Sequence, residues 1–297
     1  MKKSKMNART SPQRRLASTT TRYVVDYIDH APVWQGPVFA KSVFRPTQNG
    51  APDKPLEIRW TSKFQDTAQF VLRSPRALNI TDQAVYFHLC QLLAAGKGVV
   101  LRVDDPEYAA WQDVIAAKGF GAGDSMSLVC VTPLDLAAGI GLTRTGTNAK
   151  SVIESLSRLA QAMIERKFLF EGRELQGTGR FLGFMIGDRN LRIALHFESS
   201  KLAEKRTRVA WINMREHRCV RSKPAKRLHA WLSAWASPIQ RKPVGWDSLL
   251  ANVWGEAPAS PSIRKDRMRT LRKAIQEVGK LPGWSCVITE DGRQLLV

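Results

Sequence analysis

The chain has 297 residues, of which 43% are hydrophobic and 24% charged, and this composition suits a globular protein with two buried cores. Its formal net charge of +20 predicts a polyanionic partner, and no run approaches the roughly 18 consecutive apolar residues of a membrane-spanning helix, so nucleic acid is favoured over a membrane. Because the basic N-terminus lacks the apolar run of a signal peptide, we expect a cytoplasmic protein.

The spacing of cysteines and histidines gives no sign of a metal site or a disulfide. The four cysteines form no CxxC pair, which predicts reduced, mostly buried thiols. The five histidines show no HxH, HExxH or HxxxH spacing. We therefore expect no disulfide, no metal and no cofactor.

The first 53 residues carry few signals of packed structure. Residues 1–30 are predicted to be a disordered basic tail, because the first 22 hold seven Lys or Arg, no acid and little apolar content. Residues 31–53 are rich in Pro and Gly, which predicts an irregular arm that leads to a strand at 56–60.

A first core helix is expected over 82–95. Thr81 is a good N-cap residue, and apolar side chains then recur at helical spacing until Gly96. A second helical stretch is expected to begin at Pro106. The β-branched run SLVCVT that follows predicts a short strand.

The next segments have the order of a helix-turn-helix with a wing. Pro133 begins a short apolar helix, and the turn LTRTGTN leads to a long helix over 149–167 with an apolar stripe that extends to Met163. Two alternating segments joined through QGTG predict a β-hairpin, and a further strand is expected after the turn GDRN. We assign residues 54–200 to an N-terminal winged-helix domain.

The same order recurs after a basic linker expected at 201–222. Residues 223–297 contain an amphipathic helix, a Leu-rich helix, a basic helix over 262–278 and a hairpin with an Asp-Gly turn. The tryptophans of this region are expected to fill its core rather than to stack on single-stranded bases. The predicted fold class is therefore α+β: tandem winged helix-turn-helix domains, mainly helical, with small β-hairpin wings.

The basic helix is the main candidate for contact with DNA. It carries six Lys or Arg residues and two acids in seventeen positions, with Ser262 as the expected N-cap and an apolar stripe from Met268 to Val278. The opposite face would enter the major groove, while Arg264 and Arg267 project nearer the core, where they could reach the DNA backbone. The candidate DNA-binding residues on this helix are Ser262, Arg264, Lys265, Asp266, Arg267, Arg269, Thr270, Arg272 and Lys273.

The earlier long helix carries a milder polar set. Its side chains suit phosphate contacts near a helix N-terminus, and a protein interface is the alternative. The candidates are Thr147, Asn148, Lys150, Ser151 and Arg158, with Ser155 expected on the same polar face.

Motifs for catalysis are missing from the sequence. Neither GIGLTRTG nor AAGKGV has the GxxxxGK[ST] spacing of a nucleotide-binding loop. The paired histidines of rolling-circle initiators and the HxxR element of tyrosine recombinases are also missing. Asp104 and Asp105 precede Pro106 and are expected to cap a helix. We therefore expect no catalytic residues and a protein that is not an enzyme.

Two parts of the chain resemble a known family. The segment RLHAWLSAW, followed by WDSLLANVWGEAPASPSIRKDRMRTLRKAIQEV and GWSCVITEDG, resembles the iteron-binding plasmid replication initiators (Rep), most closely the RepC initiators of IncQ-type plasmids. The earlier NAKSVIESLSRL looks like a helix of the family's first domain. The resemblance covers 54–297.

The resemblance implies a non-enzymatic initiator that binds direct repeats (iterons) in double-stranded origin DNA. It also implies local melting, recruitment of a replicative helicase, primase as a further partner, and an N-terminal domain that contacts the other half of the repeat or forms a self-dimer. By this resemblance the DNA-reading positions are Ser262, Lys265, Asp266, Arg269 and Lys273. Asp266 departs from an all-basic helix and leaves the base preference open.

Two other functions remain as alternatives. A winged-helix transcriptional regulator could use the same elements on an operator, although tandem, non-identical units favour one chain that spans a long repeat. An enzyme such as a primase or nickase would need a site that none of the motifs indicates.

Overall fold

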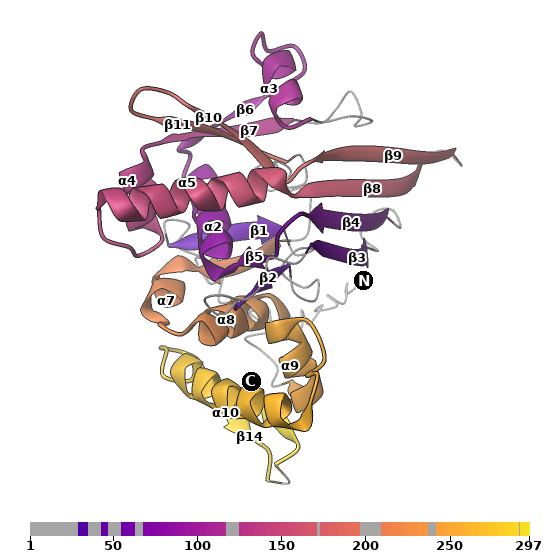
Figure 1. Ribbon diagram of the computed structural model, residues 1–297, viewed down its shortest axis with the longest axis vertical. Helices are drawn as coiled ribbons and strands as arrows, with labels where there is room; N and C mark the ends of the chain where they lie inside the picture. Colours follow the sequence, from indigo (N-terminus) through magenta and orange to yellow (C-terminus); the bar gives the residue numbers. More distant parts are fainter. Residues whose placement is uncertain are drawn as a thin grey trace, which may run out of the picture.

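The computed structural model describes residues 29–34, 43–46, 55–62, 68–116, 125–170, 173–196, 209–236, 242–290 and 292–297. Figure 1 shows an N-terminal body of helices and small sheets above a smaller C-terminal body, with α8 (Lys223–Trp235) between them. Helices and strands are mixed along the chain, so the predicted α+β class is confirmed. The predicted tail, apart from residues 29 and 30, lies outside the described residues, as do most of the predicted arm and residues 201–208 of the predicted linker.

Two four-stranded antiparallel sheets make up much of the N-terminal body. The first contains, in spatial order, β3 (Leu56–Ser62), β4 (Ala68–Ser74), β8 (Met163–Phe170) and β9 (Arg173–Arg180). The second contains β10 (Leu182–Ile186), β11 (Leu191–Leu195), β7 (Met126–Val131) and β6 (Gly98–Leu101). The strands expected at 56–60, from SLVCVT and after GDRN are confirmed.

Four helices among the described residues belong to this body. They are α2 (Ile80–Ala94), α3 (Tyr108–Val114), α4 (Pro133–Gly139) and α5 (Gly146–Gln161). Helix α5 packs against both α2 and α4, so the short and long helices expected around the turn LTRTGTN are present and in contact. Figure 1 shows α5 running along this body below the sheet that contains β10 and β11.

Helix α2 begins earlier than predicted. Its N-cap is Asn79, whose side-chain oxygen accepts hydrogen bonds from the backbone N–H groups of Thr81 and Asp82 at 2.7 and 3.1 Å. The Asp82 carboxylate accepts the N–H of Asn79 in return, at 2.8 Å. This reciprocal capping box satisfies more of the free N–H groups at the helix start than Thr81 alone would.

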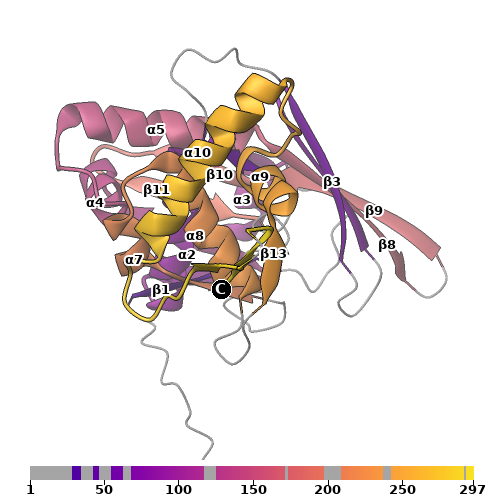
Figure 2. The same cartoon turned by 90° about the horizontal axis from the view of Figure 1, so that it is seen from below.

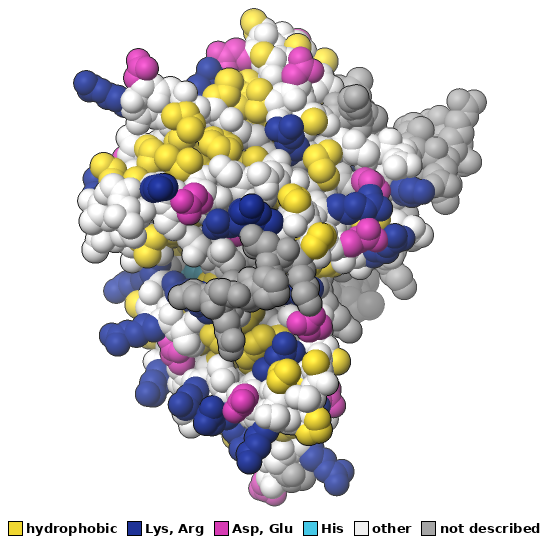
Figure 3. Space-filling view, viewed as in Figure 1, with side chains coloured by type: hydrophobic (Ala, Val, Ile, Leu, Met, Phe, Trp, Pro, Cys, Tyr) yellow, Lys and Arg dark blue, Asp and Glu magenta, His cyan; other side chains and the backbone are white. Residues whose placement is uncertain are grey.

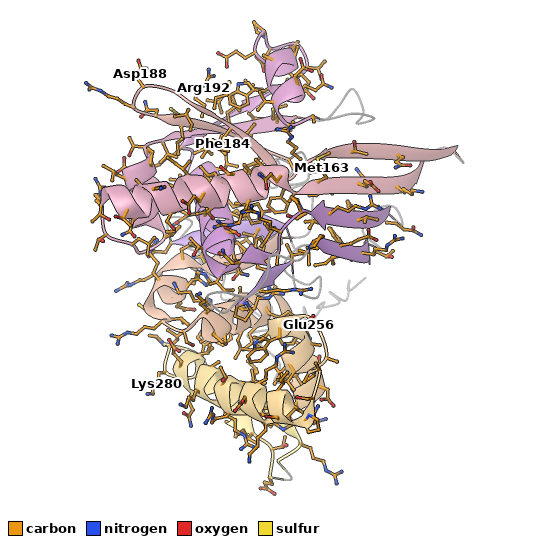
Figure 4. All side chains as sticks on the ribbon, in the orientation of Figure 1. Met163, Phe184, Asp188, Arg192, Glu256 and Lys280 are labelled. Atoms are coloured by element: carbon orange, nitrogen blue, oxygen red, sulfur yellow. The ribbon has the colours of Figure 1, made fainter. Side chains whose placement is uncertain are left out.

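The long helix is predicted to extend to residue 167, but α5 ends at Gln161. Val152, Leu156 and Leu159 form the buried stripe of α5, but Met163 is the first residue of β8. Figure 4 labels Met163 at the point where α5 gives way to the strand. Strand β8 pairs with β4 on one side and β9 on the other, and these two ladders favour extended backbone over another helical turn. QGTG lies within β9 rather than in a turn.

Two segments expected to be irregular pair with each other. The composition predicts an arm at 31–53 and a linker at 201–222, yet β1 (His30–Trp34) forms an antiparallel ladder with β12 (Val209–Asn213). Ala31 and Val33 are fully buried. Helix α7 (Met214–Cys219) follows directly, and β2 (Phe44–Arg45) pairs in parallel with β5 (Leu78–Asn79). Burial of apolar side chains explains why these parts of the arm and linker are ordered.

The C-terminal body follows the predicted order of elements. After α8 come β13 (Pro243–Gly245), α9 (Trp246–Trp254), α10 (Pro261–Val278), β14 (Val287–Ile288) and β15 (Gln294–Leu296). The strands form one sheet in the order β13-β15-β14. Gly292, the second residue of the predicted Asp-Gly turn, has a φ of 67°, which glycine adopts readily, and Asp291 lies outside the described residues.

The buried side chains form two main cores. The first lies in the N-terminal body, and the second is built from α8, α9, α10 and β15. Helix α8 contributes to both, since Ala230 packs in the first core while Leu228 and Trp231 pack in the second. The predicted core role of the C-terminal tryptophans is confirmed: Trp231, Trp235, Trp246, Trp254 and Trp284 all belong to the second core or pack against it.

The cysteines are free thiols in two kinds of environment. Burial raises the pKa of Cys90 to about 12 and that of Cys286 to about 11, so both stay protonated at neutral pH. Cys130 and Cys219 are exposed, so the prediction of mostly buried thiols is wrong for these two.

A column of rings crosses from one core to the other. Phe87 on α2 contacts His217 on α7 with ring centroids 5.6 Å apart, and His217 lies 5.7 Å from His229 on α8. His229 in turn lies 5.4 Å from Trp284. Burial lowers the pKa of His217 well below its ordinary value of 6.5, and the charges of nearby cationic groups act in the same direction.

Because His217 is buried, we expect the stability of the protein to fall in mild acid. A histidine that stays neutral when folded but titrates when unfolded costs about 1.4 kcal/mol of stability for each pH unit below its unfolded pKa. The stability that comes from keeping His217 neutral is therefore fully present above its unfolded pKa of about 6.5. It is lost as the pH falls below that value, because the pKa of His217 is lower in the folded protein. Burial also lowers the pKa of His88, which adds a contribution of the same sign.

We expect His217→Phe to flatten the dependence of unfolding free energy on pH between 7.5 and 5.5. Neither ring nitrogen of His217 has a hydrogen-bond partner among the described residues, so phenylalanine removes the titration without removing such a bond. Urea denaturation at several pH values gives the slope of unfolding free energy against pH. A change in stability that the substitution causes equally at every pH does not alter this slope. A variant with the wild-type slope would contradict the assignment to His217.

Candidate DNA interface

Helix α10 lies on the lower surface of the molecule. Leu271, Ala274, Ile275 and Val278 are buried toward α8 and α9. Figure 2, seen from below, shows α10 running across this face with no other labelled element in front of it. The predicted apolar stripe is confirmed, and the opposite face of the helix is open to solvent.

The N-cap of α10 lies two residues earlier than predicted. Ser260 is the N-cap, with its hydroxyl accepting the N–H of Ile263 at 3.3 Å, and Pro261 is the first helical residue. Proline suits this position because its missing N–H would have no partner inside the helix. Ser262, the predicted cap, is instead an exposed residue of the first turn.

The outer face of α10 is strongly basic. Figure 3 shows Lys and Arg predominating over Asp and Glu around the lower body, where α10 lies. Most of the candidates on the helix are exposed, whereas Arg267 and Thr270 are half-buried. The exposed candidates are Ser262, Arg264, Lys265, Asp266, Arg269, Arg272 and Lys273.

Two of the arginines tie α10 to the preceding helix. The Arg264 guanidinium lies 2.5 Å from the carboxylate of Asp247 in the first turn of α9. Arg267 donates to the backbone carbonyl of Glu256 at 3.0 Å and lies over the ring of Trp254, 5.7 Å from its centroid. The contacts of Arg267 agree with its half-buried position nearer the core, whereas Arg264 is exposed, and both arginines link the start of α10 to α9 and the turn that follows it.

A further arginine lies beside the C-terminal hairpin. The Arg272 guanidinium lies 5.8 Å from the ring centroid of Trp246, and the Trp246 indole N–H donates to the carbonyl of Gly292 at 2.8 Å. This arrangement places a cation of α10 next to the strand pair that follows the helix. A cation held between a helix and a strand pair is suited to contact with a phosphate.

Asp266 contacts a neighbouring cation on the exposed face. Its carboxylate accepts a hydrogen bond from Arg269 at 3.2 Å, three residues further along α10. Both side chains are about two-thirds or more exposed, at 67% and 73%, so the pair contributes little to stability. Its effect is on geometry, because it restricts the directions in which the Arg269 guanidinium can point.

The start of α5 is the second candidate surface. Thr147 and Lys150 are exposed, and Ser151 is half-buried. The Asn148 side chain donates to the carbonyl and the hydroxyl of Thr143, both at 2.9 Å, so it orders the turn before the helix. This turn and the first residues of α5 form a polar, solvent-facing helix start.

Arg158 has a different environment from the one predicted. Its Nε donates to both oxygens of Asp82 at 3.1 Å, and its Nη2 donates to one of them at 2.9 Å. The Asp82 side chain is fully buried, and the buried Ser155 hydroxyl also donates to it. Ser155 is therefore not on a polar surface, and the Arg158 guanidinium is directed into the protein rather than toward a ligand.

The described residues give no sign of a metal site or a membrane span. No group of three or more His, Cys, Asp or Glu side chains in this part of the chain could hold a metal ion. No helix there is long and apolar enough to cross a membrane.

Asp105 accepts the N–H of Arg102 at 2.5 Å within a turn, whereas α3 has Glu107 as its N-cap, so the predicted capping by Asp104 and Asp105 is wrong.

Comparison with known proteins identifies the family. The family model described as Replication protein C (RepC) matches residues 23–293. Two solved structures of domains 2 and 3 of RctB are similar, with TM-scores of 0.47 and 0.49 and sequence identities of 13% and 14%. The matched regions cover 85% and 88% of this chain, and 92% and 94% of the two RctB chains. The curated proteins include no match. Because the family model spans nearly the whole sequence, the chain belongs to the Replication protein C (RepC) family of replication initiators.

Proposed function

We propose that this protein is a sequence-specific plasmid replication initiator that binds direct repeats in double-stranded origin DNA through α10. The observation that carries the proposal is the position of α10: it packs on α8 and α9, precedes a strand pair and presents a basic outer face. This is the order of a winged helix-turn-helix, in which the last helix enters the major groove. Members of the family are generally DNA-binding proteins without catalytic activity.

The side chains of α10 divide into two groups in this proposal. Lys265, Arg269 and Lys273 recur every four residues on the outer face and would reach base edges, with Asp266 directing Arg269. Ser262 lies on the same outer face in the first turn and would also reach a base edge, while Arg264, Arg267, Thr270 and Arg272 lie to either side, where they would contact phosphates. Arg264 and Arg267 are already held by α9 and its following turn, which limits the entropy lost on binding.

The N-terminal body would contact the other half of each repeat. Helices α4 and α5 with the β8–β9 hairpin suit an N-terminal winged-helix unit within residues 54–200, and residues 223–297 would be the C-terminal one. Thr147, Lys150 and Ser151 would contact phosphates at the start of α5, with Asn148 holding the turn. This unit is also the proposed surface for self-dimerisation.

The protein would act in the cytoplasm together with the replication machinery. Binding of several copies to adjacent repeats would favour melting of a nearby AT-rich stretch, where pyrimidine–purine steps unstack easily. The separated strands would then receive a replicative helicase and primase. These partners follow from the resemblance to iteron-binding initiators.

Footprinting of the purified protein on its own replicon tests the proposal. We expect protection of an array of direct repeats, each covering about two helical turns, because two helix-turn-helix units in one chain span about that length. Protection of a single palindrome at a promoter would instead identify a transcriptional regulator. Metal-dependent nicking or primer synthesis by the protein alone would overturn the non-enzymatic assignment.

A further inference from the structure

Helix α7 joins the two bodies through side chains that point in opposite directions. Glu216 accepts a hydrogen bond from the indole N–H of Trp284 at 2.9 Å, and Trp284 packs in the second core. Arg218, two residues later, donates to the carbonyl of Gly139 at the end of α4, at 3.0 Å. One short helix therefore contacts both α4 of the proposed N-terminal helix-turn-helix and the segment that follows α10.

Glu216 is held in place from several sides. Its Oε2 also contacts Nε2 of His229 on α8 at 2.9 Å. Its Oε1 accepts from the Asn213 side chain at 3.1 Å, and its N–H donates to the Asn213 side-chain oxygen, which caps α7. Both carboxylate oxygens are thus engaged, and the group has few alternative positions.

The side chains around Glu216 are buried and closely packed. The ring column from Phe87 through His217 and His229 to Trp284 runs beside it, and both histidines are almost fully buried. Helix α8 passes between the two cores and contributes side chains to each. Close-packed interiors of this kind resist sliding and rotation of the parts they join.

The C-terminal end of α10 is tied to the same region. Glu277 accepts hydrogen bonds from the backbone N–H and the hydroxyl of Ser222, the N-cap of α8, the latter at 2.7 Å. A continuous series of contacts therefore runs from α4 through α7 and α8 to α10. Because α4 packs on α5, this series links the two helices that are proposed to contact DNA.

We propose that α7 is a rigid strut that fixes the separation of α5 and α10, and that it thereby makes the protein selective for the spacing between the two halves of a repeat. This inference rests on the proposed function. Glu216, Arg218 and Trp284 are positioning residues, since they act through the two helices and do not contact DNA themselves. One inserted base pair would shift a half-site by about 3.4 Å along the duplex and rotate it by about 35°, which a rigid strut does not accommodate.

A distance measurement on the free protein tests the strut without DNA. Exposed Cys130 and Cys219 would be replaced by serine, and spin labels would be attached through Glu154→Cys on α5 and Gln276→Cys on α10, both exposed positions. Pulsed electron paramagnetic resonance should give one narrow distance distribution, which broadens on adding Trp284→Phe or Glu216→Ala. A broad distribution in the parent, or no change in either variant, would overturn the strut.

Binding to spacer variants tests the consequence for recognition. The duplexes carry the footprinted repeat with none, one or two base pairs inserted between its halves. Wild type should bind the duplex with one inserted base pair roughly tenfold more weakly than the duplex with none, which is within the usual cost of one misplaced base contact. The ratio of these two affinities is the spacer ratio, and Trp284→Phe should bring it toward one. Phenylalanine keeps an aromatic ring near His229, removes the N–H that reaches Glu216 and loses part of the indole volume, a loss of volume that the Trp235→Phe control shares.

Trp235→Phe is the matched control, since Trp235 stacks on Trp231 within the second core, with ring centroids 5.1 Å apart. It should leave the spacer ratio at the wild-type value. Equal ratios for wild type and Trp284→Phe would overturn the inference while leaving the initiator function intact. If wild type bound none of the duplexes, the proposed function itself would fail, and the inference on repeat spacing with it.

Discussion

Replacing Arg158 with methionine should lower the free energy of unfolding by about 3–5 kcal/mol, the usual cost of removing one partner from a buried ion pair. The side chain of Asp82 has no exposed surface, and among the described residues Arg158 is the cation paired with it. Methionine keeps much of the aliphatic volume of arginine but leaves the carboxylate buried without that cation. Urea denaturation followed by circular dichroism measures the change.

Lys150→Met provides the matched comparison on the same helix. Lys150 is exposed at the start of α5, so its substitution should change stability by less than about 0.5 kcal/mol. Asp82→Asn combined with Arg158→Met should cost less than the sum of the single changes, because the two groups interact directly. A urea midpoint for Arg158→Met equal to that of Lys150→Met would return Arg158 to the set of candidate DNA contacts.

The C-terminal body was the more predictable part of the fold because its signals are local. The apolar stripe of α10, the Leu-rich α9 and the Gly292 turn each depend on residues within a few positions of one another. Even the error at the start of α10 is small, since Ser260 and Ser262 flank the same proline. Helical periodicity and caps carry this information in the sequence itself.

The N-terminal body was less predictable because its strands pair over long distances. Nothing near 30–34 indicates a partner at 209–213, and the composition of both segments suits irregular structure. Met163 continues the helical spacing of α5, yet β8 is extended because β4 lies on one side of it and β9 on the other. A short apolar run does not reveal by periodicity alone which of the two conformations it adopts.

The candidate site shows the same division. Exposure along α10 could be predicted from spacing, whereas the contacts of Arg264 with Asp247 and of Arg158 with Asp82 join residues 17 and 76 positions apart. An acid in the first turn of α2 looks like an ordinary helix-start residue, so the sequence gives no sign that it is fully buried. Only the tertiary packing separates an arginine that is available to DNA from one that is engaged inside the protein.

Replacing Arg269 with alanine should weaken binding to the repeat by about 1–3 kcal/mol, roughly 5- to 150-fold, if its guanidinium reads a base. Binding to random DNA should fall much less, because only one of many basic groups is lost. Both affinities need the same salt concentration, since phosphate contacts make binding strongly salt-dependent. An equal loss on both DNAs would show that Arg269 contacts phosphate alone.

Lys280→Ala controls for the loss of one positive charge. Lys280 is exposed just beyond α10, and Figure 4 shows it at the other end of the C-terminal body from Glu256, which Arg267 contacts. Its substitution should leave the ratio of specific to random binding unchanged. A loss of specificity as large as that of Arg269→Ala would mean that the DNA extends over the C-terminal end of the helix.

Asp266→Ala separates orientation from simple electrostatics, because the two effects have opposite signs. The substitution raises the net charge by one, so attraction to phosphates alone would tighten binding to every DNA. If Asp266 instead holds Arg269 in position, the variant should bind the repeat more weakly while binding random DNA more tightly. In the double variant with Arg269→Ala, removing Asp266 should cause no further loss on the repeat, since a carboxylate that acts by orienting Arg269 has no remaining partner to orient.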